Sequence, residues 1–452
     1  MSITEFLKLA FFLVLISNII FTTPSLFGNA AAEPTLFDNE LRMEEVFKGL
    51  EFPSNMAFLG PNDILVLEKD NGMVKRIENG VMFAKPLLDV NVANKKYERG
   101  LLGIASVKGN SSKPTYIFLY YTESATKDGS DNCPRNNYCY PGNEPLGNRL
   151  YRYELDNTNN KLINPKLLLD LPATPGPAHN GGIIVVGPDN NIYLVVGDIL
   201  GYYNKNSSTT AQNFQNGSLA DGRAGILRIT QDGRTVGEGI LGKDDPLDKY
   251  YAYGIRNSFG MDFDPLTGNL WDTENGPEYG DEINLVKPGF NSGWMVLQGL
   301  WKPIKVLGHP LRDFVSGGIL IGNETVSLVN FNGRGEYAAP KFIWYTPAIP
   351  TAIKFLNSDK LGKQYENDMF VGDMYGNIYH FDLSKNRTEL ALYDVLHDKI
   401  ANSFNEAEIV TFGKGFGGSL RGITDMEVGP DGYLYIVSYE GTIYRIVPAR
   451  TS

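Results

Sequence analysis

GPDNNIYLVVGD (residues 187–198) predicts the fold more directly than any other stretch of this chain. A Pro-Asp-Asn-Asn turn precedes Ile192–Val196, a short apolar and aromatic run, and glycine and aspartate follow it. Turn residues of this kind beside a β-branched and aromatic run are typical of a β-hairpin. The chain repeats the same pattern at 60–77, 264–276, 367–383 and 429–446.

Repetition of the hairpin predicts the architecture. Hairpin cores fall near residues 56–77, 101–122, 182–198, 258–286, 352–383 and 425–446. Repeated units of this kind suit a propeller, whose blades pack face to face around an axis. We expect an all-β fold, a six-bladed β-propeller of four-stranded blades over residues 40–450, in which the strand near 442–446 shares a blade with the segment after Leu36. A β-sandwich is the alternative, although it rarely needs so many hairpins.

Three long Asn-, Ser- and Gly-rich segments separate the hairpins, at 123–148, 199–222 and 300–340. We expect them to be surface loops over one mouth of the propeller. Loops carried on a rigid scaffold are where binding and catalytic residues concentrate.

The N-terminus has the features of an export signal. Leu9–Phe21 is a mostly apolar run of 13 residues behind Lys8, and Ala30–Ala32 supply small residues after it. The run is too short for an ordinary membrane span, so residues 1–32 are interpreted as a signal peptide. Because Glu5 offsets Lys8, an uncleaved N-terminal anchor is the alternative. Either way we expect an extracellular, cell-surface or periplasmic protein.

Composition excludes several classes of function. The net charge is −11 and no Lys/Arg cluster is present, which argues against nucleic-acid or anionic-membrane binding. Motifs of metalloproteases, P-loop NTPases and α/β-hydrolases are absent from the sequence. His309, His380 and His397 have no partners at a spacing that suggests a metal.

The only two cysteines, Cys133 and Cys139, lie close together in a Pro/Asn/Gly-rich segment. In an exported chain, such a pair predicts a disulfide that closes a local loop. Two cysteines alone cannot form a four-thiolate metal site.

His179 is one of only four histidines and lies in a Gly-rich turn directly before a strand. Imidazole suits proton abstraction near neutral pH, and Asn180-Gly181-Gly182 leave little bulk around the ring, so a ligand could approach it. A surface or hydrogen-bonding histidine is the alternative.

The block 251–296 contains two more candidate features. Arg256 and Asn257 lie between a glycine and a strand, where the guanidinium could project into a central cavity. In NGPEYGDEIN, Gly276-Pro277 has acidic neighbours, and carbonyls and carboxylates in such a turn can face a hard cation such as Ca²⁺. A solvated acidic turn is the alternative.

These motifs form an ordered series. HNGG, GPDNNIYLVVGD, YGIRN, LWDTENGP, GDEINLVKPG and N-x-GW, with ERGLLGIA at 98–105, resemble the soluble glucose/sorbosone dehydrogenase family over residues 45–447. The resemblance implies a six-bladed propeller that binds pyrroloquinoline quinone (PQQ) and Ca²⁺ and oxidises a sugar or related alcohol. The substrate, the electron acceptor and the oligomeric state stay open.

The resemblance also implies roles for individual residues. His179 matches the general base, Arg256 and Asn257 match the pair that contacts the quinone oxygens, and the carbonyls of Gly276 and Pro277 match the Ca²⁺ ligands. Further polar or aromatic residues of the cofactor pocket are implied at Glu98, Asp198 and Tyr345.

The chain departs from the family where cations would meet the PQQ carboxylates. Met374 stands in place of a lysine, and Gly422 and Thr424 stand in place of an Arg-x-Arg pair. PQQ carries three carboxylates, and each lost charge-assisted hydrogen bond costs roughly 1.5–3 kcal/mol. Arg421 and Lys414 are the candidate substitutes.

Two functions therefore compete. The leading hypothesis is an exported PQQ- and Ca²⁺-dependent sugar (aldose) dehydrogenase with His179 as the base. The alternative is a non-catalytic Ca²⁺-binding propeller that binds glycans or a protein partner at the cell surface. A Ca²⁺-dependent lactonase or hydrolase fits less well, because the Asn/Glu ligand set of such sites is not evident.

Overall fold

A computed structural model describes residues 34–94, 98–127, 129, 144–199, 208–306, 314–322, 324–417 and 422–449. The proposed signal over 1–32, the pair Cys133 and Cys139, and Arg421 lie outside these ranges. No helix within them is long and apolar enough to cross a membrane.

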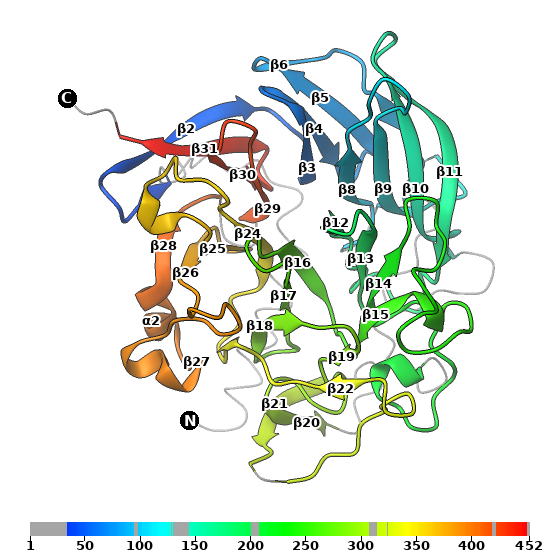
Figure 1. Ribbon diagram of the computed structural model, residues 1–452, viewed down its shortest axis with the longest axis vertical. Coiled ribbons are helices and arrows are strands. Elements are labelled where there is room, and N and C mark those ends of the chain that lie inside the picture. The colour runs from blue at the N-terminus through cyan, green and yellow to red at the C-terminus, as the bar shows by residue number, and fades with distance from the viewer. Residues whose placement is uncertain are drawn as a thin grey trace, which may run out of the picture. The chain divides into compact units, whose positions relative to one another are not determined.

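The described residues are mostly β-strands, and each predicted hairpin core lies in a sheet of its own (Figure 1). The first sheet contains β3 (Pro53–Gly60), β4 (Asp63–Glu68), β5 (Met73–Glu78), β6 (Val81–Met82) and β7 (Leu88–Asp89). The second contains β8 (Leu101–Val107), β9 (Tyr116–Glu123), β10 (Gly147–Asp156) and β11 (Lys161–Leu171). The third contains β12 (Ile184–Val186), β13 (Ile192–Val196), β14 (Gly225–Ile229), β15 (Tyr250–Tyr253), β19 (Phe290–Asn291) and β22 (Glu336–Tyr337).

The second half of the chain is built in the same way. The fourth sheet contains β16 (Ser258–Phe263), β17 (Leu270–Glu274), β18 (Asp281–Val286), β23 (Phe342–Trp344) and β27 (Ile400–Ala401). The fifth contains β24 (Pro350–Phe355), β25 (Met369–Asp373), β26 (Ile378–Phe381), β28 (Thr411–Lys414) and β1 (Thr35–Leu36). The sixth contains β29 (Ile423–Val428), β30 (Leu434–Ser438), β31 (Thr442–Pro448) and β2 (Leu41–Lys48). A short α-helix, α2 (Phe404–Ala407), follows β27.

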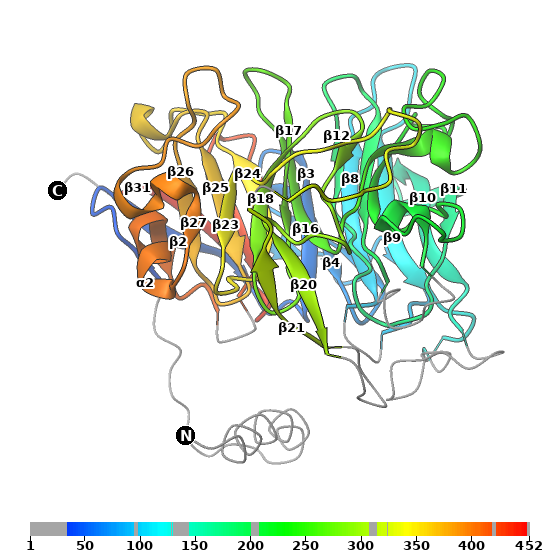
Figure 2. The same ribbon diagram turned by 90° about the horizontal axis from the view of Figure 1, so that it is seen from below.

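The first strand of each sheet contacts the first strand of the next in a closed order. That order is β3, β8, β12, β16, β24, β29 and back to β3. Figure 1 shows these strands nearest the centre, and Figure 2 shows the sheets from the side. The all-β propeller prediction is therefore confirmed.

The number of strands in a sheet differs from the prediction. Among the described residues, only the second and sixth of these sheets have four strands, and the others have five or six. Short strands such as β1, β19, β22 and β27 lie in connecting segments and add to the outer edges, where main-chain groups would otherwise lack partners.

The predicted closure of the ring is confirmed. β2 pairs antiparallel with β31, from Leu41 opposite Pro448 to Lys48 opposite Thr442. The last sheet thus combines both ends of the described chain.

The prediction of a surface loop over residues 300–340 is wrong in part. β20 (Trp301–Val306) pairs with β21 (Phe314–Leu320) as a two-stranded sheet. Trp301 is buried against Tyr279 and Tyr345, so this hairpin is anchored by an aromatic side chain that the polar composition of the segment obscured.

Packing between neighbouring sheets explains the apolar run in the opening stretch. All five residues of β13 are buried. One apolar cluster joins Leu194 to residues of the preceding sheet such as Phe118, and another joins Val195 to residues of the following sheet such as Met261. Because the sheet is covered on both faces, the strand has no polar face.

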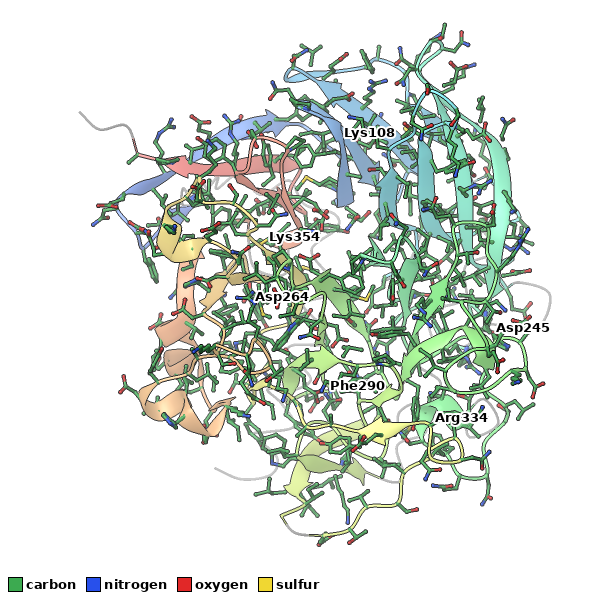
Figure 3. All side chains as sticks on the ribbon, viewed as in Figure 1. Lys108, Asp245, Asp264, Phe290, Arg334 and Lys354 are labelled. Atoms are coloured by element: carbon green, nitrogen blue, oxygen red, sulfur yellow. The ribbon has the colours of Figure 1, made fainter. Side chains whose placement is uncertain are left out.

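A partly buried lysine connects three sheets. Lys354 of β24, labelled in Figure 3, lies between carboxylates from the two neighbouring sheets. Its Nζ is 3.3 Å from Asp262 Oδ1 of β16 and 2.8 Å from Glu427 Oε2 of β29. Burial disfavours the charged form, but the neighbouring carboxylates outweigh it and raise the pKa of Lys354.

Candidate functional site

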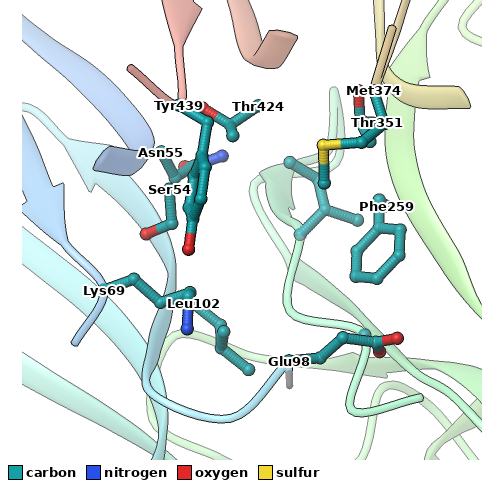
Figure 4. A pocket seen from close by; sticks show the side chains of 12 residues that line it. Ser54, Asn55, Lys69, Glu98, Leu102, Phe259, Thr351, Met374, Thr424 and Tyr439 are labelled. Atoms are coloured by element: carbon teal, nitrogen blue, oxygen red, sulfur yellow. The ribbon is translucent and has the colours of Figure 1, made fainter. Parts of the chain in front are cut away.

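A cavity of about 250 Å³ lies at the centre of the ring (Figure 4). Its position follows from its lining, because residues from the innermost strands of five sheets contribute to it. They are Ser54 and Asn55 of β3, Leu102 of β8, Phe259 of β16, Thr351 of β24 and Thr424 of β29. Lys69, Glu98, Gly181, Ile183, Met374 and Tyr439 complete the lining.

His179 lies in the loop that leads to Gly181 and is held in an unusual backbone conformation. Its φ is +62°, in the left-handed region that residues other than glycine rarely adopt. The Glu98 carboxylate accepts a hydrogen bond from the His179 N–H at 2.6 Å, and the His179 carbonyl accepts one from Ile199. Backbone strain of about 1–3 kcal/mol persists only where its surroundings impose it, and it clusters at functional sites.

The His179 ring is oriented by a buried carboxylate. His179 Nδ1 is 2.6 Å from Asp198 Oδ1, and Trp294 Nε1 donates to Asp198 Oδ2 at 2.7 Å. Asp198 is completely buried. With Asp198 ionised, this hydrogen bond assigns the proton to Nδ1, so Nε2 is the basic nitrogen.

Glu98 connects this pair to Asn257 and to the cavity. Glu98 Oε2 also accepts a hydrogen bond from Asn257 Nδ2 at 3.1 Å, and Asn257 Oδ1 accepts one from Gly181 N–H at 3.3 Å. The structure therefore brings together His179, Asp198, Glu98 and Asn257, which are far apart in the sequence.

Arg256 is buried next to the same cluster. Its Nη1 donates to the Asn275 carbonyl at 2.8 Å, and its Cζ lies 5.4 Å from the Trp294 ring centroid. Its backbone N–H donates to Glu274 Oε1. The guanidinium is thus a fixed cation next to Trp294, the residue whose indole N–H donates to Asp198.

The Gly276-Pro277 turn is positioned by an aspartate. Asp281 Oδ1 accepts from Gly276 N–H at 2.8 Å, and Asp281 Oδ2 accepts from Ile349 N–H at 2.7 Å. The interpretation that carboxylates of this segment face a cation is not supported for Asp281, whose two oxygens hold backbone groups.

A different oxygen fits a hard cation at this turn. Asn275 Oδ1 is buried and accepts no hydrogen bond from any described residue. It belongs to the residue directly before the carbonyls of Gly276 and Pro277. Because Ca²⁺ prefers carboxylate, amide and backbone oxygens, these residues fit Ca²⁺.

Two buried carboxylates, Asp272 and Glu274, belong to β17, the strand that leads into the turn. Burial raises the pKa of Asp272 to about 7 and is also the main reason why the pKa of Glu274 is raised. Glu274 Oε2 accepts a hydrogen bond from the Ser292 hydroxyl at 2.5 Å.

These burial effects predict a pH-dependent stability. A folded-state pKa of about 7 for Asp272, against an ordinary value of 3.8, means that the folded chain binds more protons than the unfolded chain between these values. Stability is therefore lost as pH rises from about 4 to about 7. We expect Asp272→Asn to melt above the wild type at pH 8 and the difference to shrink at pH 5. Asp359→Asn, at an exposed position, should show no such pH-dependent difference, and an equal gap at both pH values would contradict the prediction.

The glycines around His179 allow two backbone segments to pack closely, in addition to leaving space for a ligand. A Cβ at Gly181, whose φ is +63°, would lie 2.5 Å from the Val195 carbonyl oxygen. At Gly197 a Cβ would lie 2.4 Å from the His179 carbonyl oxygen. Close approach of the two backbone segments therefore requires glycine at both positions.

Tyr345 is placed in an aromatic cluster. Its ring centroid lies 6.0 Å from that of Tyr279 and 5.3 Å from that of Trp301. Gly280 N–H approaches the Tyr345 carbonyl at 3.3 Å, so the tyrosine borders the Gly276–Gly280 turn.

The cavity matches a planar ring better than it matches three carboxylates. Phe259, Tyr439 and Leu102 offer flat or apolar walls. Among the described lining residues, Lys69 is the one cation, and its Nζ already donates to Asp70 and to the Arg99 carbonyl. The described lining therefore fits the ring of PQQ and leaves its carboxylates short of cationic partners.

The three positions that depart from the family pattern explain this shortage. Met374 lines the cavity, and the Thr424 hydroxyl donates to the Pro53 carbonyl at 3.0 Å. At Gly422 a Cβ would lie 2.3 Å from Gly376 N, so no longer side chain fits there.

The prediction that Lys414 could replace these cations is wrong. Lys414 ends β28, toward the outer edge of its sheet, and its Nζ pairs with Glu408. In this sheet β25 and β26 lie between β28 and β24, the strand that lines the cavity, so Lys414 is separated from the cavity by two strands.

Trp294 and Glu274 were missed as parts of the site. The N-x-GW and LWDTENGP motifs contain them, but nothing in either motif indicates a partner. Their hydrogen bonds to Asp198 and to the Arg256 backbone join residues that are 96 and 18 positions apart, so they arise only when the strands of the third and fourth sheets assemble.

Comparison with known proteins identifies the family of the chain. The sequence model of the Glucose / Sorbosone dehydrogenase family matches residues 50–302, more than half of the chain. The chain belongs to the glucose/sorbosone dehydrogenase family. This family member is similar to the aldose sugar dehydrogenase YliI of Escherichia coli, with 24% identity over 403 residues that cover 88% of this chain and 91% of that protein.

Two further relatives are a quinoprotein and a PQQ-bound enzyme. Quinoprotein glucose dehydrogenase B of Acinetobacter calcoaceticus is 29% identical over 293 residues, 61% of this chain and 56% of that protein. The PQQ-bound form of aldose sugar dehydrogenase from Streptomyces coelicolor is 21% identical, with a TM-score of 0.58 over 92% of this chain and 99% of that one. At this identity the structural likeness shows the shared fold alone. The named relatives are sugar dehydrogenases, which are oxidoreductases.

Proposed function

We propose that the protein is an exported sugar dehydrogenase that oxidises an aldose or related alcohol with PQQ and Ca²⁺ and passes electrons to an acceptor. The observation that carries this proposal is the His179–Asp198 pair, held in a strained loop beside the central cavity. Its motifs and its relatives support the same activity.

His179 acts as the general base. Its Nε2 accepts the proton of the sugar hydroxyl while Asp198 holds Nδ1–H and stabilises the imidazolium that forms. Trp294 keeps the Asp198 carboxylate in place, and Glu98 keeps the His179 backbone in place.

Arg256 stabilises negative charge that develops on the hydride acceptor. A cation already held by the Asn275 carbonyl and the Trp294 ring needs little reorganisation during the reaction. When bound, PQQ supplies the quinone that takes up the hydride, and Ca²⁺ supplies a Lewis acid. The carbonyls of Gly276 and Pro277 with Asn275 Oδ1 would hold the Ca²⁺.

The proposal also includes six blades and export of the protein. The six inner strands in closed contact order support six blades, with the short extra strands as edge additions. The apolar run and small residues at the N-terminus support export.

Reconstitution tests the proposed activity. The metal-free chain is titrated with PQQ, with and without Ca²⁺, while absorbance and melting temperature are followed, and dye reduction is then assayed with a panel of aldoses. We expect a PQQ-dependent rise in melting temperature that requires Ca²⁺, and dye reduction with at least one aldose. Absence of both PQQ binding and dye reduction would refute the proposal.

A second candidate function is favoured by the lack of cations at Met374, Gly422 and Thr424 in the central region. A non-catalytic propeller would bind a glycan or a protein partner at the cell surface. It would show stabilisation by Ca²⁺ without any response to PQQ, and glycan binding would be unaffected by His179→Ala.

A further inference from the structure

Three metal-ligating side chains meet on one face of the fifth sheet, away from the strands that line the central cavity. One ligand atom each from Asp368, His380 and Asp382 lie within 4.8 Å of one another. His380 Nε2 is 3.0 Å from Asp368 Oδ2 and 3.6 Å from Asp382 Oδ1. Spacing along the chain does not reveal this group.

Register explains how the three residues meet. β25 and β26 pair with Phe370 opposite His380 and Met369 opposite Phe381. Continuing the ladder by one position sets Asp368 opposite Asp382. Because side chains alternate along a strand, Asp368, His380 and Asp382 share one face.

Among the described residues, no lysine or arginine neutralises the two carboxylates of this group. Two carboxylates directly opposite each other on a sheet are destabilising. Among the ion pairs of the described residues, neither aspartate has a lysine or arginine partner, and His380 is the shared contact. A divalent cation would neutralise both carboxylates and use the imidazole nitrogen as a third ligand.

The histidine ring is held by aromatic neighbours. Its centroid lies 5.0 Å from that of Phe370 and 5.1 Å from that of Tyr365. These rings restrict the imidazole, so little conformational freedom is lost when a metal binds. His380 and Asp382 also line a hollow of about 210 Å³, which gives an ion and its water access from outside.

We propose that Asp368, His380 and Asp382 form a binding site for a divalent transition-metal ion of the zinc class, separate from the Ca²⁺ site of the proposed activity. A nitrogen and two carboxylate oxygens form a ligand set suited to Zn²⁺, whereas Ca²⁺ takes six to eight oxygens. Three protein ligands leave a fourth position for water, on the side of the hollow.

Zinc binding to the full chain tests the site. The protein is stripped with a chelator, saturated with Ca²⁺ and titrated with Zn²⁺ by calorimetry, and Co²⁺ then serves as a visible-absorption probe of ligand geometry. We expect one Zn²⁺ per chain at this site, with affinity at least about tenfold lower in His380→Gln and Asp382→Asn. Co²⁺ should give the intense absorption of a tetrahedral site in the wild type alone.

Matched variants separate this site from surface binding. His397→Ala removes an exposed histidine from the same region and should leave Zn²⁺ affinity unchanged. Asp382 is half exposed and lies opposite a second carboxylate, so without zinc Asp382→Asn should melt at or above the temperature of the wild type. Unchanged affinity in both site variants, loss of affinity in His397→Ala, or no Zn²⁺ binding by the wild type would overturn the proposal. None of these outcomes depends on dye reduction or PQQ binding.

Discussion

Replacing His179 by alanine is expected to lower kcat for aldose oxidation by the reconstituted protein about 10²–10⁴-fold, the usual contribution of a general base. The substitution removes Nε2 as the proton acceptor and leaves the Asp198 carboxylate buried beside an empty space. Steady-state dye reduction at saturating PQQ and Ca²⁺ measures the effect. A melting curve recorded in parallel shows whether the fold is retained.

Two variants sharpen this test. Asp198→Asn keeps a side chain of the same shape but removes the charge that stabilises the imidazolium, so kcat should fall while KM for the sugar changes little. His397→Ala, at an exposed site, should leave kcat unchanged. If His179→Ala kept more than a tenth of the activity, His179 would not be the base.

Replacing Lys354 by methionine is expected to lower the free energy of unfolding by about 1–3 kcal/mol, because the two carboxylates that lose their cation are partly buried. Methionine has a similar length but leaves the partly buried carboxylates of Asp262 and Glu427 without their shared cation. Because these carboxylates come from the two neighbouring sheets, the loss acts on contacts between sheets rather than within one hairpin. Urea unfolding followed by tryptophan fluorescence measures it.

The control for this variant is an exposed lysine. Lys385→Met changes the same residue type at the surface and should alter stability by less than about 0.5 kcal/mol. Equal unfolding midpoints for the Lys354→Met variant and the wild type would show that the partly buried ion pairs contribute no net stability. In that case apolar packing and the other hydrogen bonds between the sheets, such as Thr351 Oγ1 to the Ile423 carbonyl, hold the three sheets together.

Most of the fold could be predicted from local sequence. The turn before Ile192 and the apolar run that follows identify a hairpin because φ > 0 turn residues and β-branched strands act over a few positions. The pairing of β2 with β31 was also predictable, because a closed ring of blades needs the first strands of the chain to complete the last sheet. Edge strands of two residues, such as β19 and β27, carry no such local pattern and were missed.

The candidate site could be predicted only in part. His179, Arg256 and Gly276-Pro277 lie in motifs that resemble a known family, so their residue types could be identified. Their contacts could not, because the hydrogen bonds from Trp294 to Asp198 and from the His179 N–H to Glu98 join residues that are 96 and 81 positions apart. Lys414 shows the converse, since closeness in sequence to Gly422 did not bring it to the cavity.

Residue order alone was enough to establish an all-β chain of repeated hairpins and to single out His179, because turn chemistry and strand periodicity are short-range properties. Tertiary structure was needed to place Asp198 against the imidazole, to bring Glu98 and Gly181 to the central cavity, and to join Asp368 with His380 and Asp382. The physical reason is that charge and hydrogen bonding act across space over a few ångströms. Sheet register and ring closure decide which distant residues come within that range.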